Sequence, residues 1–315
     1  MTRSALRGRQ SGIALILVLW VTILLTVIAG SFAFAMRTDM QVVRNSVSLA
    51  RVQAAADGAM YRALYESYKP FNDLDRWKAD GVEHEVAFEG ASVMVSALDE
   101  SGKIDINTAA PELLKGLFVS VGIEDEAATA LVDAVQDWRD SDDLARPHGA
   151  EEKEYQAAGL KYKPANLPFQ TIDELRLVLG MSPDIYRRIE NVITVYSRQP
   201  GLNLNIAPRA SLLAIPGVTA EQVDTFIAQR EAARAANQPI PLFPAAQRFA
   251  GAAFNLAFSL RADARLEDGT VFVREAVVQV LPDPKRPFAF LAWKESSPVA
   301  VQPSEGSTTE DGKPR

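Results

Sequence analysis

The strongest constraint on the fold is a run of 24 residues without a charged side chain, from Ile13 to Met36. At about 1.5 Å per residue, a helix over this run is roughly 36 Å long, against a hydrocarbon core of about 30 Å. Three arginines and no acid precede the run, whereas Arg37 and Asp39 behind it nearly cancel. This asymmetry predicts a membrane-spanning helix with the N-terminus in the cytoplasm and the rest of the chain across the membrane.

Composition bounds what the remaining chain can be. The 315 residues are 48% hydrophobic and 23% charged, enough to bury one or two soluble domains. A formal net charge of −7 argues against a surface that neutralises phosphates, so no nucleic acid partner is expected. The absence of cysteine excludes disulfides, thiolate nucleophiles and cysteine-ligated metals, and two histidines do not suffice for a multi-histidine metal site.

The junction ahead of the apolar run has a distinctive order, because a basic leader ends in Gly12 immediately before Ile13. A cleaved secretory signal, with small residues at 29–33, and a plain signal anchor are two ordinary interpretations of such a run. The junction instead resembles the type III leader of prepilins and pseudopilins. That resemblance implies that a prepilin peptidase cuts after Gly12 and methylates the new N-terminus, so that the mature chain begins at Ile13.

The sequence after the apolar run favours a continuous helical stem. From Arg37 to Tyr68 there is no proline and only one glycine, Gly58, and Pro70 follows. A helix from Ile13 to Tyr68 is about 84 Å long. Apolar side chains at mostly three- or four-residue spacing predict one face that packs on a globular head. These are Val43, Val47, Val52, Ala56, Met60, Ala63 and Leu64.

The fifth residue of the expected mature chain departs from the pilin pattern. Most pilins and pseudopilins carry Glu there, and its carboxylate pairs with the N-terminal ammonium of the subunit below. In this chain the position is Leu17, which cannot make that pair, and an unpaired buried ammonium is costly. Among pseudopilins, the absence resembles the K component of the type II secretion system, which sits at the filament tip.

Strand patterns occur in two places that are far apart in the sequence. Residues 83–98 read as two strands around a Glu89-Gly90 turn, and 255–260 with 270–281 flank a turn at 267–269. Between them, 104–247 reads as almost wholly helical. The predicted fold class is α+β, with a pilin-like N-terminal helix, an α/β head with an antiparallel sheet, and a large inserted all-α domain.

The expected organisation follows from these segments. We expect a leader over 1–12, a transmembrane helix over 13–36, a periplasmic stem over 37–69, a head made of 70–102 and 248–295, an inserted helical domain over 103–247, and a disordered tail over 296–315.

The insert contains an internal repeat, divided as about 103–198 and 199–247. Residues 105–114 resemble 203–213, and each is followed by a glycine and a new helix, at Gly122 and Gly217; Gly180 marks a third corner. Thr219 is placed to cap the helix that follows Gly217, with Gln222 closing a capping box.

Such corners are typical of helix-hairpin-helix (SAM-like) modules, whose DNA-binding versions offer backbone N–H groups to phosphates. The alternative function is therefore a membrane-anchored helix-hairpin-helix protein that binds or takes up DNA. The ordinary interpretation is that each glycine allows a tight turn between packed helices. The acidic run 124–126 at the first corner argues against DNA.

The densest charge pattern lies between the hairpins, where seven carboxylates fall within the eighteen residues 137–154. Closely spaced oxygen ligands suit Ca²⁺, although the spacing is not that of an EF-hand. An acidic run is also commonly a solvated face. The pattern alone leaves both interpretations open.

A wider resemblance bears on this cluster. Asp137-Trp138, Asp140, Asp142, Arg146-Pro147, Gly149-Ala150-Glu151, Tyr162, Pro164, Asn166, Pro168-Phe169, Glu174-Leu175, Val178 and Gly180-Met181 are similar to the central signature of the type II secretion K family. The resemblance implies that the insert binds structural Ca²⁺ through Asp140, Asp142 and Glu151, with Asp137 and Asp143 as further ligands. Asn166 would contribute an oxygen or fix the loop.

The same resemblance implies the function. We expect a minor pseudopilin that caps the tip of the periplasmic pseudopilus and helps initiate its assembly, for protein export across the outer membrane of a Gram-negative bacterium. Its partners would be the I and J pseudopilins, the pseudopilus and the prepilin peptidase, with a single pass through the inner membrane. No enzyme is expected, because Gly-x-Ser-x-Gly, His-Glu-x-x-His and phosphate-loop motifs are absent. Composition alone does not exclude a membrane-tethered hydrolase that uses paired carboxylates.

Overall fold

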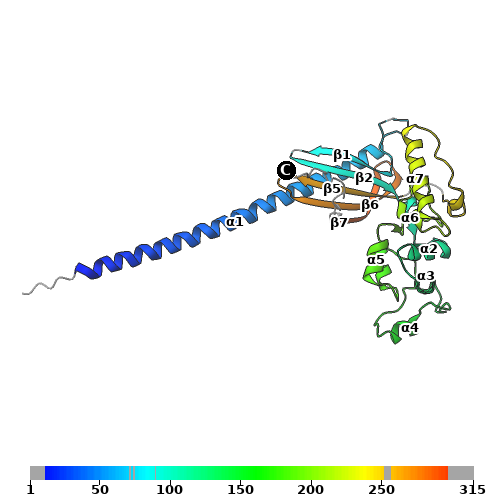
Figure 1. Ribbon diagram of the computed structural model, residues 1–315, viewed down its shortest axis with the longest axis horizontal. Helices are drawn as coiled ribbons and strands as arrows, with labels where there is room; N and C mark the ends of the chain where they lie inside the picture. Colours follow the sequence, from blue (N-terminus) through cyan, green and yellow to red (C-terminus); the bar gives the residue numbers. More distant parts are fainter. Residues whose placement is uncertain (1–10, 71, 74, 89, 252–256, 297–315) are drawn as a thin grey trace, which may run out of the picture.

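One long helix, α1 (Ser11–Ser67), leads from the N-terminal end into the globular part (Figure 1). The structure, a computed structural model, describes residues 11–70, 72–73, 75–88, 90–251 and 257–296. The N-terminal part of α1 is apolar and long enough to cross a membrane, and its most apolar window is not buried by the rest of the chain. Most of the predicted leader, the predicted turn residue Glu89, part of the predicted strand over 255–260 and nearly all of the predicted tail lie outside the described residues.

A five-stranded antiparallel sheet forms the part of the head that packs on α1. Its strand order is β1-β2-β5-β6-β7. The strands are β1 (Asp80–Phe88), β2 (Ala91–Asp99), β5 (Ala257–Leu266), β6 (Val271–Asp283) and β7 (Arg286–Ser296). Because β2 pairs directly with β5, the early hairpin and the late strands form one sheet, as the sequence pattern predicts.

The edge strand β7 was not predicted as a strand, and it contains a bulge. Val277 pairs with Ala292 and Val278 pairs with Phe290, so one extra residue lies on β7. The extra residue shifts the alternation of side chains, and Phe290 and Trp293 consequently come together, with ring centroids 4.8 Å apart.

The C-terminal half of α1 packs on this sheet through apolar side chains. Val52, Ala56 and Met60 are fully buried, against residues such as Val95 and Leu260. We call this unit, the end of α1 from Ser48 with the five strands, the sheet lobe.

Two residues of the predicted packing face do not belong to it. Val43 and Val47 are 58% and 47% exposed. At about 100° per residue, Val47 lies about 140° around the helix from Val52, so these valines point away from the buried stripe. The three- and four-residue spacing could not separate two apolar faces on one helix.

Residues 100–251 form a second unit, the helical insert, which lies beside the far end of α1 (Figure 1). Its elements are η1 (Glu100–Gly102), β3 (Ile104–Asp105), α2 (Pro111–Ser120), α3 (Asp125–Arg139), α4 (Glu152–Ala157), η2 (Ile172–Leu177), α5 (Pro183–Ile189), β4 (Ile193–Thr194), α6 (Arg209–Leu213), α7 (Ala220–Ala235) and η3 (Pro244–Phe249). The short strands β3 and β4 pair in parallel, and irregular segments over 140–151 and 158–171 separate the helices. The prediction of an almost wholly helical insert was therefore wrong in these places, where pairing and loop packing between distant segments override the local pattern. The insert buries its own apolar core, which includes Leu113, Leu117 and Tyr155.

The two similar segments, 105–114 and 203–213, each contain a side-chain turn at their start. The Asp105 side chain accepts a hydrogen bond from the backbone N–H of Asn107 at 2.8 Å, and that of Asn203 accepts one from Asn205 at 3.2 Å. These turns precede the pairs α2/α3 and α6/α7. A Cβ atom on Gly116 would lie 2.0 Å from the carbonyl oxygen of Ala214, so α2 and α6 approach backbone to backbone.

Candidate functional site

The acidic loop between α3 and α4 is organised around Asp137. This carboxylate is fully buried because it lies on the inward face of α3. The next residue, Trp138, stacks on Phe169 with ring centroids 6.0 Å apart. Its Oδ2 accepts hydrogen bonds from the backbone N–H groups of Arg146 and Ala150, at 3.1 and 2.9 Å. Asp137 therefore holds the returning loop against the end of α3.

Arg146 lies between two of the carboxylates. Its Nη1 donates to Asp137 Oδ1 at 2.5 Å and also to Asp140 Oδ2. These charge-assisted bonds raise the pKa of the Arg146 guanidinium although its partial burial acts in the opposite direction. One cation of the chain itself thus compensates part of the acidic cluster.

Gly149 is required by this close approach. A Cβ atom at this position would lie 1.9 Å from Asp137 Oδ2, so any other residue would push the loop off the carboxylate. Gly149 belongs to the family signature, but the sequence indicates no particular role for it. The signal that could have revealed that role is a glycine twelve residues after an acid at the end of a predicted helix.

Glu151 is 5% exposed and precedes α4, where its backbone N–H donates to Glu154 Oε2 at 2.9 Å. Burial is the largest cause that raises the pKa of Glu151 to about 7, followed by the charges of Asp137 and Asp140. A carboxylate in this position gains from any additional positive charge.

Asn166 fixes the other side of the loop, and its backbone has a positive φ of 49°. Its Nδ2 donates to the carbonyl oxygen of Asp142 and to Asp143 Oδ1, both at 3.0 Å. Three buried oxygens around the loop have no hydrogen-bond partner among the described residues: Asp140 Oδ1, Glu151 Oε1 and Asn166 Oδ1.

These orphaned oxygens test whether a cation fits. Buried polar atoms are normally paired, and carboxylate and amide oxygens are the donors that Ca²⁺ takes. The donor set therefore fits a hard divalent cation. In the part of the chain that the structure describes, no three His, Asp or Glu side chains stand close enough together to hold a metal.

The three predicted hairpin glycines all have left-handed backbones. Gly122, Gly180 and Gly217 have φ values of 88°, 87° and 78°, and residues that carry a Cβ atom rarely adopt such values. The predicted capping box is confirmed: Thr219 Oγ1 accepts from the N–H of Gln222 at 3.2 Å, and Gln222 Oε1 accepts from that of Thr219 at 2.9 Å.

The predicted processing residues lie at the start of α1. Gly12 and Ile13 belong to its first turn, and Leu17 is 62% exposed on the uncovered apolar part. These positions are far from the acidic loop, at the opposite end of the molecule (Figure 1).

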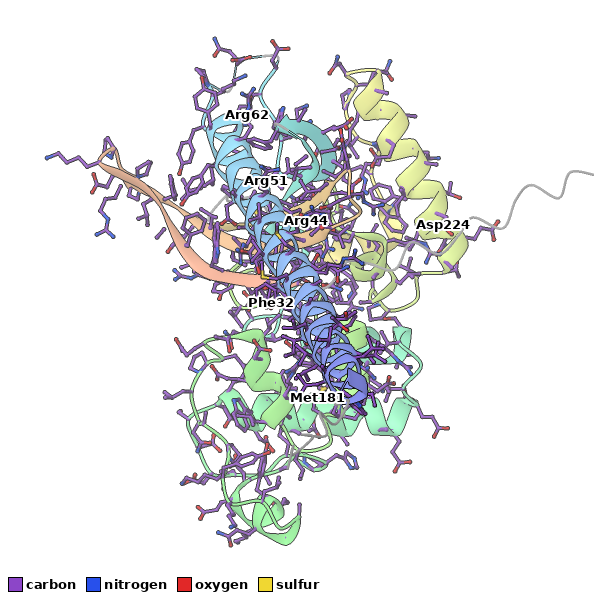
Figure 2. The ribbon with its side chains drawn as sticks, turned by 90° about the vertical axis from the view of Figure 1, so that its left-hand side faces the viewer. Phe32, Arg44, Arg51, Arg62, Met181 and Asp224 are labelled. Carbon is purple, nitrogen blue, oxygen red and sulfur yellow. The ribbon has the colours of Figure 1, made fainter. Side chains whose placement is uncertain are left out.

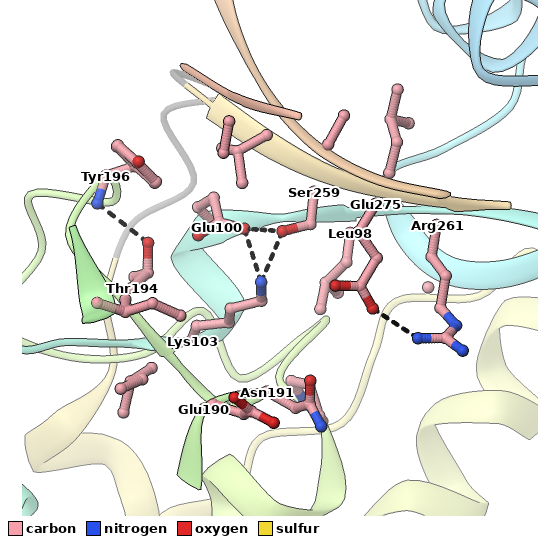
Figure 3. Close-up of a pocket in the computed structure, with 18 of the residues that line it drawn as sticks. Leu98, Glu100, Lys103, Glu190, Asn191, Thr194, Tyr196, Ser259, Arg261 and Glu275 are labelled. Carbon is pink, nitrogen blue, oxygen red and sulfur yellow. Dashed lines mark hydrogen bonds and ion pairs between the residues drawn. The ribbon is translucent and has the colours of Figure 1, made fainter. Parts of the chain in front are cut away.

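A cavity of about 580 Å³ separates the insert from the sheet. Figure 3 shows Glu100 and Lys103 beside Ser259 of β5 on its wall; Lys103 Nζ donates to Glu100 Oε1 at 2.8 Å and to Ser259 Oγ at 2.6 Å. Arg261 and Glu275 pair on the same wall at 2.5 Å. The bonds of Glu100 and Lys103 to Ser259 attach the first turn of the insert to the sheet, a role that the sequence did not indicate, whereas the pair of Arg261 and Glu275 lies within the sheet, between β5 and β6.

The family model for protein K of the type II secretion system matches residues 94–198. The chain is 26% identical over 255 residues to Type II secretion system protein K of Pectobacterium carotovorum subsp. carotovorum, covering 71% of this chain and 76% of that protein. It is 25% identical over 246 residues to the protein of the same name from Pseudomonas aeruginosa, covering 71% and 74%.

A solved structure is similar in fold. A chain in the crystal structure of the GspK-GspI-GspJ complex from the enterotoxigenic Escherichia coli type 2 secretion system matches with a TM-score of 0.54 and 15% identity. The match covers 84% of this chain and 99% of that one. At this identity the likeness concerns the α+β fold.

Proposed function

The chain belongs to the family of type II secretion system protein K, and we propose that it is a minor pseudopilin that caps the tip of the periplasmic pseudopilus. The observation that carries the proposal is the uninterrupted helix α1, which is uncovered and apolar at one end and packs under the sheet at the other. Such a helix places a head at a fixed height above a membrane, as a filament subunit requires.

The membrane end of α1 supports a single pass through the inner membrane, with the N-terminus in the cytoplasm and the head in the periplasm. The apolar part carries no charge between Ile13 and Met36, and arginines dominate ahead of it. A prepilin peptidase would cut after Gly12 and methylate Ile13, leaving the apolar helix at the very start of the mature chain.

Two features favour the tip over the shaft. Leu17 offers no carboxylate to the subunit below. The helical insert, with its own core, lies beside the far end of α1 (Figure 1), where a further subunit would have to stack. A chain that lacks the downward contact and obstructs the upper one ends a filament and serves to start its assembly.

The partners would be the other minor pseudopilins, the I and J components. The similar solved chain comes from a complex named for GspK, GspI and GspJ. The helix-hairpin-helix corners would serve packing within the insert, since Glu124 is the N-cap residue of α3 and Asp125 and Glu126 begin it, where a DNA phosphate would have to bind.

Calcium would act structurally in the acidic loop. Asp140, Glu151 and Asn166 present oxygens without partners, and Asp142 and Asp143 lie beside them. A bound Ca²⁺ would supply positive charge to carboxylates that Arg146 compensates only in part. Asp137 would support the loop as a hydrogen-bond acceptor. The role is one of folding, and no catalysis is assigned to these acids.

The test of the tip assignment uses the full chain in membranes of its own cells. We expect deletion of the gene to stop secretion, the intact chain to restore it, and the chain to co-purify with other minor pseudopilins. Restored secretion without any co-purified pseudopilin would contradict the assignment.

Replacing Leu17→Glu restores the carboxylate that shaft subunits carry. We expect the variant to enter the shaft, so that more of it is recovered per length of sheared pseudopilus, measured by quantitative immunoblotting. Leu19→Glu is the matched control, since it adds the same charge to the apolar helix at another position. Equal recovery of both variants would remove Leu17 as a reason for the tip position.

A further inference from the structure

Beyond the membrane, α1 keeps an apolar row that nothing in the described chain covers. Met40, Val43 and Val47 are 57%, 58% and 47% exposed, and Ala50 and Ala54 continue the row as exposed residues. Their spacing alternates between three and four residues, the pattern of a helix that packs along another helix. The face that packs on the sheet begins at Val52 and lies elsewhere on α1.

A row of arginines runs beside this apolar row. Arg37, Arg44 and Arg51 are exposed and follow one another at seven-residue intervals. Seven residues turn a helix by almost two full turns, so the three side chains lie on one side, about 10.5 Å apart along the axis. Figure 2 looks along α1 from its membrane end and shows Arg44 and Arg51 at successive heights.

The chain itself neutralises little of this row. Neither Arg37 nor Arg44 makes an ion pair or a side-chain hydrogen bond within the described residues. Arg51 lies near Asp268, whose pKa is lowered to about 2, first by a hydrogen bond from Ser48 and to a smaller degree by Arg51. Two arginines beside an apolar seam thus lack an acid.

Two possible occupants fit poorly. Lipid phosphates reach only the membrane edge, because Arg51 lies about 21 Å beyond Arg37 and a headgroup layer is about 5 to 8 Å deep. A second, parallel copy of the chain would place Asp39, Ser46 and Gln53 opposite the arginines. That row contains a single carboxylate for three cations.

We propose that this face of α1 docks a parallel helix of a different subunit, one that carries Asp or Glu at seven-residue intervals beside its own apolar row. This inference rests on the proposed function, because the neighbour would be the stem of another pseudopilin. Apolar rows alone tolerate sliding, whereas a shift by one heptad would leave an arginine or a carboxylate unpaired. The arginine row therefore sets the axial height at which the two subunits join.

The experiment uses the full chain, co-expressed in membranes with the other minor pseudopilins of its own secretion system. The double variant Arg44→Glu, Arg51→Glu reverses the row, and we expect co-purified partner to fall about tenfold. The control is Arg248→Glu, Arg265→Glu, which makes the same charge change at two exposed arginines of the head and should leave co-purification unchanged.

Charge exchange identifies the contact. Replacing the heptad carboxylates of one partner stem by Arg should restore binding to the reversed chain and weaken binding to the native one. Undiminished co-purification of the reversed chain would overturn this inference and leave the proposed function intact. The inference would be overturned in favour of lipid by a different result: co-purification with the reversed chain is lost, no charge exchange in a partner stem restores it, and the reversed chain no longer binds vesicles of anionic phospholipid. Native chain without any co-purified pseudopilin would contradict the proposed function itself.

Discussion

In the sheet lobe, α1 lies on the strands through side chains such as Met60 and Val95, whereas in the insert α2 and α6 meet backbone to backbone at Gly116. The sheet lobe joins residues from three distant parts of the chain, while the insert is built from one continuous stretch. The difference indicates that the insert is intolerant of added volume, and that the sheet lobe is sensitive mainly to lost apolar area.

The largest expected effect comes from removing a core leucine in either unit. Leu113→Ala in the insert and Leu260→Ala in β5 each delete a side chain that is no more than 1% exposed, and each should cost about 3 to 4 kcal/mol. Because the two cores are separate, hydrogen exchange should rise in α2 and its neighbours for the first variant and in the sheet for the second. Uniform exchange in both variants would show that the two units unfold together.

Gly116→Ala should cause the next largest loss in the free energy of unfolding, about 2 kcal/mol. Alanine favours helices, but its Cβ would lie 2.0 Å from the Ala214 carbonyl oxygen. Gly58→Ala in α1 is the control, because its Cβ would meet the Phe88 ring at 3.0 Å and a ring end can move. Denaturant unfolding of the detergent-solubilised chain, followed by tryptophan fluorescence, measures both; equal losses would erase the contrast between the units.

The acidic loop adds a pH dependence to the insert. The pKa of Glu151 is raised from 4.5 to about 7. Between these two pH values the folded chain keeps a proton on Glu151 that the unfolded chain releases. Without divalent cations, stability from this group is present at low pH and is lost as pH rises toward 7. Thermal unfolding in chelator between pH 5 and 8 should show the fall.

Two controls sharpen this measurement. Glu151→Gln should abolish the fall, and at pH 8 added Ca²⁺ should raise the melting temperature of the native chain and not that of the variant. Mg²⁺ should act weakly, since it demands a smaller, octahedral site. Equal melting temperatures with and without Ca²⁺ would refute the calcium proposal.

The smallest effect concerns a local cap. Thr219→Ala removes the N-cap of α7 and should cost about 1 kcal/mol. Ser182→Ala removes the corresponding cap of α5, where Ser182 Oγ accepts from the N–H of Ile185 at 3.2 Å, and should behave alike. If Thr219→Ala lowered the free energy of unfolding as much as Leu113→Ala does, the cap would stabilise more of the insert than α7 alone.

Local signals along the chain predict much of the fold. The charge-free run, the absence of proline up to Tyr68, the strand pair around Gly90 and the Thr219 capping box each depend on residues near one another in sequence. The edge strand β7 and its bulge were not predicted, because they depend on pairing with β6. That pairing decides on which face of the sheet the Trp293 side chain lies. The separate apolar face at Val43 and Val47 was not predicted for the same reason: only contact with the sheet distinguishes it from the buried stripe.

The candidate site divides in the same way. Sequence alone places Asp137, Asp140, Asp142, Asp143 and Glu151 in one short segment, since they are close along the chain. It also predicts the length of α1 and the missing carboxylate at Leu17. Only tertiary structure decided that Asp137 is buried, that Arg146 lies between Asp137 and Asp140, and that three oxygens lack partners among the described residues. Spacing along a chain determines which groups can be neighbours, whereas burial and pairing depend on the segments that fold over them.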